Sequence, residues 1–195
     1  MPGTEHNNHP RALIAQPQDK VAQEVVDIIR TVKPDVVLTF DPIGGYRHPD
    51  HIYMHEITKA AFHAAGSDEF SSEFPAFQPQ KLYYHTISKR YIKFMVRMMR
   101  LLGKDPSRYG KNNDIDLADL ASVEFPTHAQ IDYGPVADRK KAASACHASQ
   151  GSSGLMGKMF DWIFRILGFR DKDQFMRAYP EPQQENLEQD LFAGL

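Results

Sequence analysis

Residues 35–51 read DVVLTFDPIGGYRHPDH, and this stretch decides the fold. It opens on a short apolar run, 35–40, which is rich in β-branched residues and does not alternate between polar and apolar positions. Such a run is typical of a strand covered on both faces. Residues 41–47 contain two glycines and predict a loop. Residues 49–65 predict a helix with proline in its first turn, where a missing N–H costs little.

A further helix is predicted before the strand, over residues 18–32. Its apolar face is formed by residues at three- and four-residue spacing, while Arg30 and the other charged side chains fall outside that face. The apolar set is Val21, Val25, Ile28, Ile29 and Val32. Helix, strand, loop and helix together predict an α/β protein with a Rossmann-like, open, mostly parallel sheet flanked by helices. Ligands of such sheets bind at the carboxyl ends of the strands, so GGYRHPDH (44–51) lies where a site is expected.

The whole chain, 1–195, is predicted to form one domain, since its length suits a single core. The remaining expected parts are a polar arm at 1–16, a strand at 81–88, a basic helix at 88–103 that opens an insertion at 89–120, a strand at 121–125, a helix at 133–150, a glycine-rich joint at 150–158 before an apolar segment at 159–169, and an extended tail at 180–195.

Composition narrows the class of protein. Hydrophobic residues make up 42% and charged residues 25%, and the net charge of −2 argues against general nucleic-acid binding. The single cysteine, Cys146, excludes an internal disulfide framework and suits a reducing compartment. The start shows no signal-peptide pattern, and no apolar run is long enough to span a membrane. A soluble, cytoplasmic protein is therefore expected.

His48, Asp50 and His51 are the chemically distinctive residues of the opening stretch. Neutral imidazole is the commonest protein ligand of zinc, and a nearby carboxylate can orient an imidazole or ligate a metal itself. Gly44 and Gly45 let the backbone turn sharply and approach a ligand closely. One interpretation is a metal and catalytic site, which the position at a strand end favours. The other is an ordinary helix start with polar caps and surface groups.

Residues 35–62, DVVLTFDPIGGYRHPDHIYMHEITKAAF, resemble the second signature of the PIG-L / LmbE-like family of zinc-dependent de-N-acetylases. Residues 132–150, DYGPVADRKKAASACHASQ, resemble a later K-x-x-A…H-x-S-Q segment of the same family. The ending FMRAYPEP, at 175–182, resembles its bacterial branch, so the likeness spans nearly the whole chain.

The resemblance implies a role for each residue of the motif. His51 would be a zinc ligand and His48 the catalytic histidine, which donates to the oxyanion or to the leaving amine. Asp50 would tune the protonation of His48, and Tyr46 would approach the substrate carbonyl. Such roles are physically sensible, because a positioned imidazolium stabilises a tetrahedral oxyanion and protonates a leaving nitrogen. His55 could ligate as well, although support or packing beneath the helix is the favoured interpretation.

The resemblance also implies the ligands. The cofactor would be Zn²⁺ or another divalent metal such as Fe²⁺, and the substrate a small N-acylated amino sugar or sugar conjugate. Arg47, His147 and Gln150 are candidate substrate contacts. No nucleic acid and no membrane span are expected as partners, and a homo-oligomer stays open.

The chain departs from the family at one point. The family's first signature, an HPDD(E) stretch, supplies two zinc ligands and the general base, and residues 1–195 contain no such stretch. His9-Pro10 is followed by Arg11 and Ala12 instead of two acids. Catalytic zinc usually needs three protein ligands. The chain is therefore expected to begin inside the family domain and to be inactive in isolation, and the alternative is a non-catalytic remnant that binds a sugar or a protein.

Three other segments allow functional interpretations. A nucleophilic Ser149 paired with His147 is disfavoured, because residues two apart on a helix point to different faces. Residues 151–158 have the wrong spacing for a phosphate loop, so a flexible joint is favoured there. The basic run 89–111 could bind an anionic membrane or an acidic partner. A helix packed by its apolar stripe, with its basic side in water, is the favoured interpretation of that run.

Overall fold

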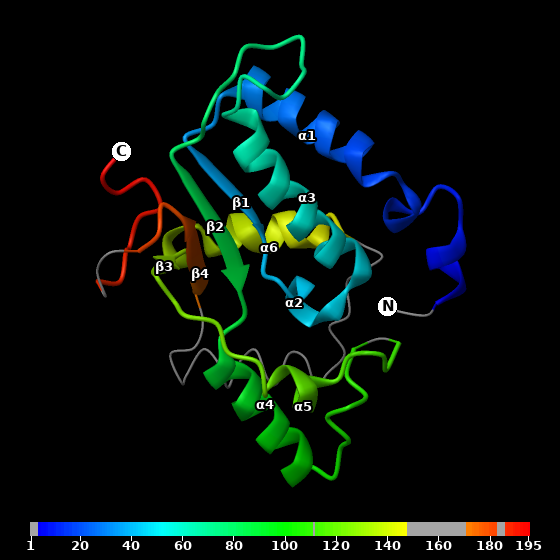
Figure 1. The fold of residues 1–195 in the computed structure, drawn as a ribbon. Helices are drawn as coiled ribbons and strands as arrows, with labels where there is room; N and C mark the ends of the chain where they lie inside the picture. Colours follow the sequence, from blue (N-terminus) through cyan, green and yellow to red (C-terminus); the bar gives the residue numbers. More distant parts are fainter. Residues whose placement is uncertain (1–3, 111, 148–170, 183–185) are drawn as a thin grey trace. The chain divides into compact units, whose positions relative to one another are not determined.

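The computed structural model describes residues 4–110, 112–147, 171–182 and 186–195 (Figure 1). The chain divides into two compact units. The first comprises Met1–Thr86, Phe125–Ala129 and Phe175–Leu195, and the second comprises Ile87–Glu124 and Gln130–Gln174. Within the described residues, no helix has the length and apolar character needed to cross a membrane.

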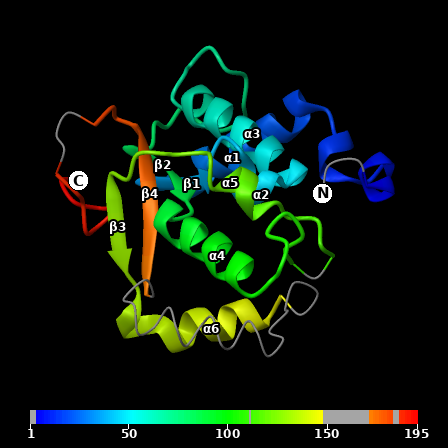
Figure 2. The same cartoon turned by 90° about the horizontal axis from the view of Figure 1, so that it is seen from below.

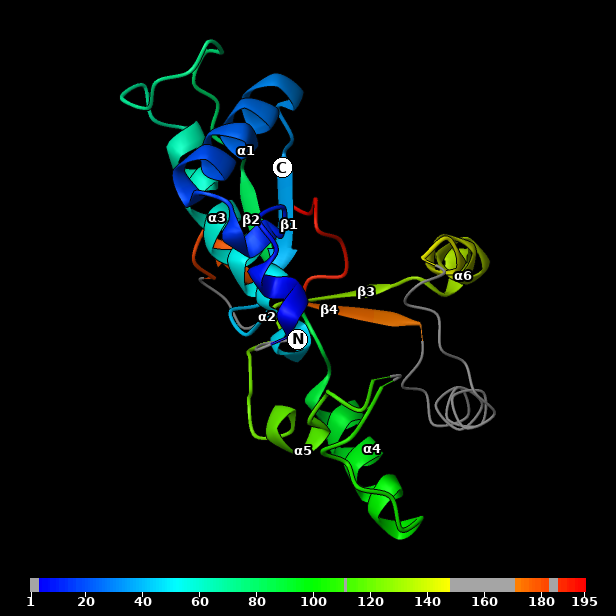
Figure 3. The ribbon, with the colours of Figure 1, turned by 90° about the vertical axis from the view of Figure 1, so that its right-hand side faces the viewer.

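The first unit contains the predicted helix, strand and second helix, and a short, kinked helical turn forms within the predicted loop at 41–47. Its elements are α1 (Gln18–Val32), β1 (Val36–Phe40), α2 (Gly44–Arg47), α3 (Pro49–Ala65) and β2 (Lys81–Thr86). Strands β1 and β2 pair in parallel, with Val36 opposite Lys81 and Phe40 opposite His85. Figure 3 shows α1 and α3 on the same side of these two strands. The fold class and the two long helices are as predicted.

Among the described residues, two apolar clusters pack within this unit. Val26 and Ile29 of α1 pack with Ala61 and Ala65 of α3, and the small alanines let the two helices approach closely. On the sheet side, the second cluster is formed by Phe62, Leu82 and Tyr84. Helix α3 is therefore fixed from both sides, which sets the position of its first turn.

The sheet contains two further strands and is mixed. Its order is β1-β2-β4-β3, with β3 at Ala129–Asp132 and β4 at Lys172–Tyr179, and Figure 2 shows β3 and β4 side by side. The His128 N–H donates to the carbonyl of Phe175, and the Tyr133 N–H donates to that of Asp171. Residue numbers rise along one strand as they fall along the other, so this pair is antiparallel.

The second unit is built around the basic helix α4 (Lys89–Leu101), which packs against the short helix α5 (Leu117–Leu120). Ile92, Met95 and Met99 of α4 are buried, while Lys93 and Arg97 are exposed. This confirms the interpretation of a helix packed by its apolar stripe. The unit also contains a 3-10 turn at Gly134–Val136 and helix α6 (Ala137–Ala145).

Several predicted details are wrong. Strand β1 is not covered on both faces. It is an edge strand of the sheet, and its Leu38 is 50% exposed. No strand forms at residues 121–125, which follow α5 as irregular chain. Strands β3 and β4 were not expected, and the helix predicted at 133–150 is shorter within the described residues. The glycine-rich joint at 150–158 and the apolar segment 159–169 lie outside those residues.

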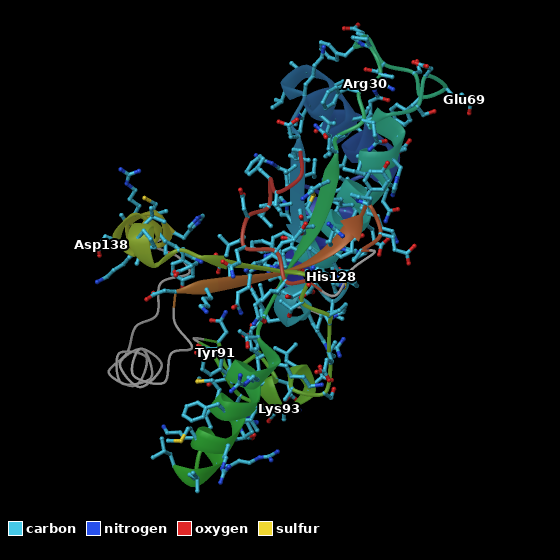
Figure 4. All side chains as sticks on the ribbon, turned by 90° about the vertical axis from the view of Figure 1, so that its left-hand side faces the viewer. Arg30, Glu69, Tyr91, Lys93, His128 and Asp138 are labelled. Atoms are coloured by element: carbon cyan, nitrogen blue, oxygen red, sulfur yellow. The ribbon has the colours of Figure 1, made fainter. Side chains whose placement is uncertain are left out.

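The exposed and buried residues of α1 also differ from those predicted from its apolar spacing. Ile28 and Val32 are 60% and 67% exposed, whereas Arg30 is buried. Arg30 donates to the carbonyls of Ala64, Ala65, Ser67, Phe70 and Phe74, at 2.7–3.3 Å. These carbonyls belong to the end of α3 and to the following loop, near Glu69 in Figure 4. This charged side chain can be buried because five backbone carbonyls accept its hydrogen bonds.

The polar arm at 1–16 has local structure, with 3-10 turns at Glu5–Asn8 and Leu13–Ala15. Its end is tied to α3, because the Tyr53 hydroxyl donates to the carbonyl of Gln16 at 2.9 Å.

Candidate active site

The loop after β1 is shaped by Asp41 and two glycines. Oδ1 of Asp41 accepts from the N–H of Ile43 at 3.1 Å and from that of Gly45 at 2.8 Å. Gly44 and Gly45 have φ of 65° and 70°, a region that residues with a Cβ rarely adopt. A Cβ on Gly44 would also lie 2.8 Å from the backbone nitrogen of Ile52. The loop can therefore pack against the first turn of α3 only with glycine at position 44.

The first turn of α3 positions His48 and Asp50. His48 is the N-cap residue, and its Nδ1 accepts from the backbone N–H of Asp50 at 3.2 Å. Pro49 follows at the first helical position, where its fixed φ suits the helix. Because Nδ1 is the acceptor, a neutral His48 ring carries its proton on Nε2. The hydrogen bond between Asp50 and His48 is thus made by the backbone N–H of Asp50.

His51 lies against the end of β1. Its ring stacks on Phe40 with centroids 3.9 Å apart and an angle of 5°, and its Nδ1 is 3.2 Å from the carbonyl oxygen of Gly44. Burial lowers the pKa of His51, and the neighbouring His48 lowers it further. A neutral ring that donates from Nδ1 to this carbonyl keeps the lone pair of Nε2 available, as a metal ligand requires.

Three rings of the motif lie together at the carboxyl end of β1. The centroids of His48 and His51 are 4.7 Å apart, and Tyr46 lies edge-on to both, at 5.8 Å and 5.3 Å. Parallel strand, loop and helix start thus bring two imidazoles and a phenol to one place, where ligands of open α/β sheets bind.

His55 lies one turn further along α3 and is buried. Its Nδ1 is 2.7 Å from the carbonyl oxygen of Phe40, and its ring meets Tyr84 edge-on. The side chain therefore joins α3 to the end of β1. This arrangement fits the favoured interpretation of support and packing beneath the helix.

The candidate substrate contacts fall in different parts of the chain. Arg47 follows Tyr46 but is exposed, with φ of 61°. His147 is exposed beyond the end of α6, in the second unit. Gln150 and Ser149 lie outside the described residues, and so does the 151–158 segment.

Two groups near the rings were not recognised in the sequence. Asp41 is only 2% exposed, and burial raises the pKa of its carboxyl group above the ordinary value. His85, at the register position opposite Phe40, is one of the two histidines whose charge acts on Asp41. Both residues stand at the carboxyl ends of neighbouring parallel strands, and this was the signal that could have identified them.

The described residues do not by themselves make a zinc site. No group of three or more histidine, cysteine, aspartate or glutamate side chains among them is placed to hold a metal ion. His51, with its available Nε2, fits the chemistry of one ligand, whereas a catalytic zinc usually takes three from protein. The metal expected from the sequence therefore needs donors beyond those that the structure brings together.

Comparison with known proteins places the chain in a family. Residues 4–62 match the family model described as PIG-L, GlcNAc-PI de-N-acetylase. The whole chain aligns with proteins named 1D-myo-inositol 2-acetamido-2-deoxy-alpha-D-glucopyranoside deacetylase. Identity is 31% to the protein of Streptomyces griseus, 30% to that of Rhodococcus jostii and 32% to the second such protein of Frankia casuarinae. The chain spans 60%, 66% and 64% of these relatives, respectively.

Solved structures agree at the level of the fold. The conserved protein TT1542 of Thermus thermophilus matches 85% of this chain and 61% of its own, with a TM-score of 0.54 and 18% identity. GalB, the 4-carboxy-2-hydroxymuconate hydratase of Pseudomonas putida, matches 87% of this chain and 62% of its own, with a TM-score of 0.52 and 12% identity. The motif at 44–51, the family model and the relatives agree, and the chain belongs to the PIG-L / LmbE-like family.

Proposed function

We propose that this chain provides the acid and oxyanion-binding part of a de-N-acetylase site, which acts on an N-acylated amino sugar or sugar conjugate. The observation that carries the proposal is the cluster of Tyr46, His48 and His51 at the carboxyl end of β1. The relatives, which are named as deacetylases of an N-acetylated glucosaminyl inositol, support the reaction class.

His48 is the proposed general acid. The Asp50 N–H holds Nδ1 as an acceptor, so the neutral ring presents its proton on Nε2. The Nε2–H can donate to the oxygen of a tetrahedral intermediate. To act as the acid, the ring first takes up a second proton at Nδ1, which ends the bond from the Asp50 N–H, and then passes the Nε2 proton to the leaving sugar nitrogen. Tyr46 is proposed to donate its hydroxyl hydrogen to the amide carbonyl. Asp50 is proposed to orient His48, through the backbone bond described above.

His51 is proposed as one ligand of a divalent metal, Zn²⁺ or Fe²⁺. When bound, such a metal polarises the amide carbonyl and acidifies a water molecule. The contribution of His51 is a neutral ring, since burial lowers its pKa and the Gly44 carbonyl lies beside its Nδ1. The remaining ligands and the general base are proposed to come from an HPDD(E)-type segment, which residues 1–195 do not contain.

A non-catalytic role is the second candidate. The lack of a three-ligand cluster among the described residues favours a module that binds an amino sugar or a protein without hydrolysis. The two candidates differ in what happens when the missing signature is supplied, because only a catalytic half-site then releases acetate.

Metal binding and acetate release test the proposal. Zinc is titrated into residues 1–195, and acetate is measured with the inositol-linked N-acetylglucosamine named for the relatives, with and without a polypeptide that carries an HPDD(E) segment. We expect weak zinc binding that His51→Ala abolishes, and acetate only in the presence of the second polypeptide. Tight, stoichiometric zinc that is unaffected by His51→Ala would contradict the role of His51. Substrate binding without acetate in the mixture would favour the non-catalytic module.

A further inference from the structure

A groove runs between α4 and α5 in the second unit, apart from the HPDH motif. It has a volume of about 710 Å³, and one wall consists of the small residues Ala118, Ala121 and Ser122. The opposite wall is formed by α4, whose sequence KRYIKFMVRMMRL contains five basic residues and no acid. The groove therefore has one basic wall and one wall of small side chains.

Three cations of α4 line this groove. Lys93, Arg97 and Arg100 recur at four- and three-residue spacing, so they form one stripe along the helix. All three are exposed, and none forms an ion pair within the part of the chain that the structure describes, although the charge of Lys93 also acts on the carboxyl group of Glu124. Lys89, one turn earlier, is paired with Glu124 at 2.7 Å. Figure 4 shows Lys93 projecting from α4.

Two exposed leucines follow Arg100 at the end of α4. Leu101, which lines the groove together with the cations, is 71% exposed, and the next residue, Leu102, is 48% exposed. Ile92, Met95, Val96 and Met99 of α4 are buried, whereas Tyr91, Phe94 and Met98 are half-buried. The helix thus keeps its packing while it presents cations and an apolar tip to a partner.

We propose that a docking face, defined as the α4 stripe Lys93, Arg97 and Arg100 together with Leu101 and Leu102 at the end of the helix, binds an anionic membrane surface. Lipid phosphates complement the three cations, and the adjacent leucines can enter the boundary between headgroups and acyl chains. A lipid surface is favoured over an acidic polypeptide because the leucines stand at the exposed end of the helix, beside the cations. The attachment is peripheral, since the apolar stripe of α4 remains packed.

Vesicle co-sedimentation tests the docking face. The full chain is mixed with vesicles of phosphatidylcholine alone or of phosphatidylcholine with phosphatidylglycerol, at low salt and at about 0.5 M salt, where charges are screened. We expect binding only to the anionic vesicles at low salt. The variant Lys93→Gln/Arg97→Gln/Arg100→Gln should bind on the order of 100-fold more weakly. The variant Leu101→Ser/Leu102→Ser should lose part of the binding, with an unchanged circular dichroism spectrum.

A matched control variant distinguishes an effect of the docking face from an effect of the net charge of the protein. Arg11→Gln/Lys20→Gln/Lys59→Gln removes three exposed cations from the first unit and should bind like the wild type. No binding of the wild type to anionic vesicles would overturn the proposal, and so would equal losses in the two triple variants. Binding to polyglutamate in the absence of vesicle binding would also overturn it, in favour of an acidic protein partner.

Discussion

Gly44 is constrained both by its backbone and by its neighbours. Its φ is 65°, and a Cβ there would lie 2.8 Å from the backbone of Ile52, so both the loop and the first turn of α3 depend on it. Gly103 offers a matched comparison, because its φ is 66° while a Cβ added there would meet nothing within 4 Å. The first glycine is required for packing, and the second only for its conformation.

We therefore expect different costs for two identical substitutions. Gly103→Ala should lower the free energy of unfolding by about 1 kcal/mol, the cost of the left-handed backbone. Gly44→Ala should cost about 2 kcal/mol more, because the new methyl group must displace α3. Urea denaturation followed by circular dichroism measures both variants. Equal losses would show that the loop does not pack on α3 as described.

His128 gives a pH dependence to the first unit. Its Nδ1 accepts from the backbone N–H of Arg177 at 2.9 Å, which requires a neutral ring. Burial lowers the pKa of His128, and the charge of Arg177 lowers it further. The unfolded chain therefore takes up the proton first as the pH falls below about 6.5. The contribution of His128 to stability is complete above that pH and is lost toward the lower folded-state pKa.

Replacement by asparagine should remove this dependence. The side-chain oxygen of His128→Asn can still accept from the Arg177 N–H but does not titrate. We expect the free energy of unfolding to fall less between about pH 7 and pH 5.5 in this variant than in the wild type. The exposed His63→Asn serves as the control and should keep the wild-type slope. An unchanged slope in His128→Asn would contradict the description.

The residues of the HPDH motif could be recognised from the sequence because their positions are local. Two histidines and an aspartate within four positions, after a strand and two glycines, are visible without any tertiary contact. Asp41 and His85 could not be recognised in the same way. Their proximity depends on the parallel pairing of β1 with β2, which joins positions more than forty residues apart.

At the scale of elements, the long helices were predictable and the later strands were not. α1 and α4 show apolar residues at helical spacing over several turns, and α3 begins at Pro49, a residue typical of a first helical turn. The observed bounds of α1 and α3 are those predicted, and α4 lies within its predicted range. β3 has only four residues and is stabilised by pairing with β4, about forty positions later in the chain. The exposed Leu38 likewise reflects a position at the end of the strand order, which is a property of the sheet and not of the run itself.

Arg30 tests the contact between α1 and the end of α3. Arg30→Met keeps most of the apolar stem but removes the donors to five backbone carbonyls, so we expect a loss of about 3 kcal/mol in the free energy of unfolding. Lys20→Met, at an exposed position of the same helix, should change it by no more than about 0.5 kcal/mol. Similar effects of the two variants in urea denaturation would show that the buried hydrogen bonds of Arg30 contribute little.

At the scale of the whole molecule, the chain combines a family motif with an incomplete set of metal donors. The described residues bring together Tyr46, His48 and His51, yet they gather no three-ligand cluster. The relatives are longer than the stretch that this chain matches, which spans 60–66% of their lengths. We therefore propose that the HPDH motif supplies part of an active site, and that hydrolysis requires further residues from another segment.

The rate of acetate release in the presence of an HPDD(E)-bearing polypeptide is the decisive measurement for this half-site. His48→Ala should lower the rate by about 10²–10⁴-fold, the usual contribution of a general acid. His63→Ala, an exposed histidine on the same helix, should leave the rate unchanged. Acetate release from the mixture at the wild-type rate with His48→Ala would show that the motif does not supply the acid.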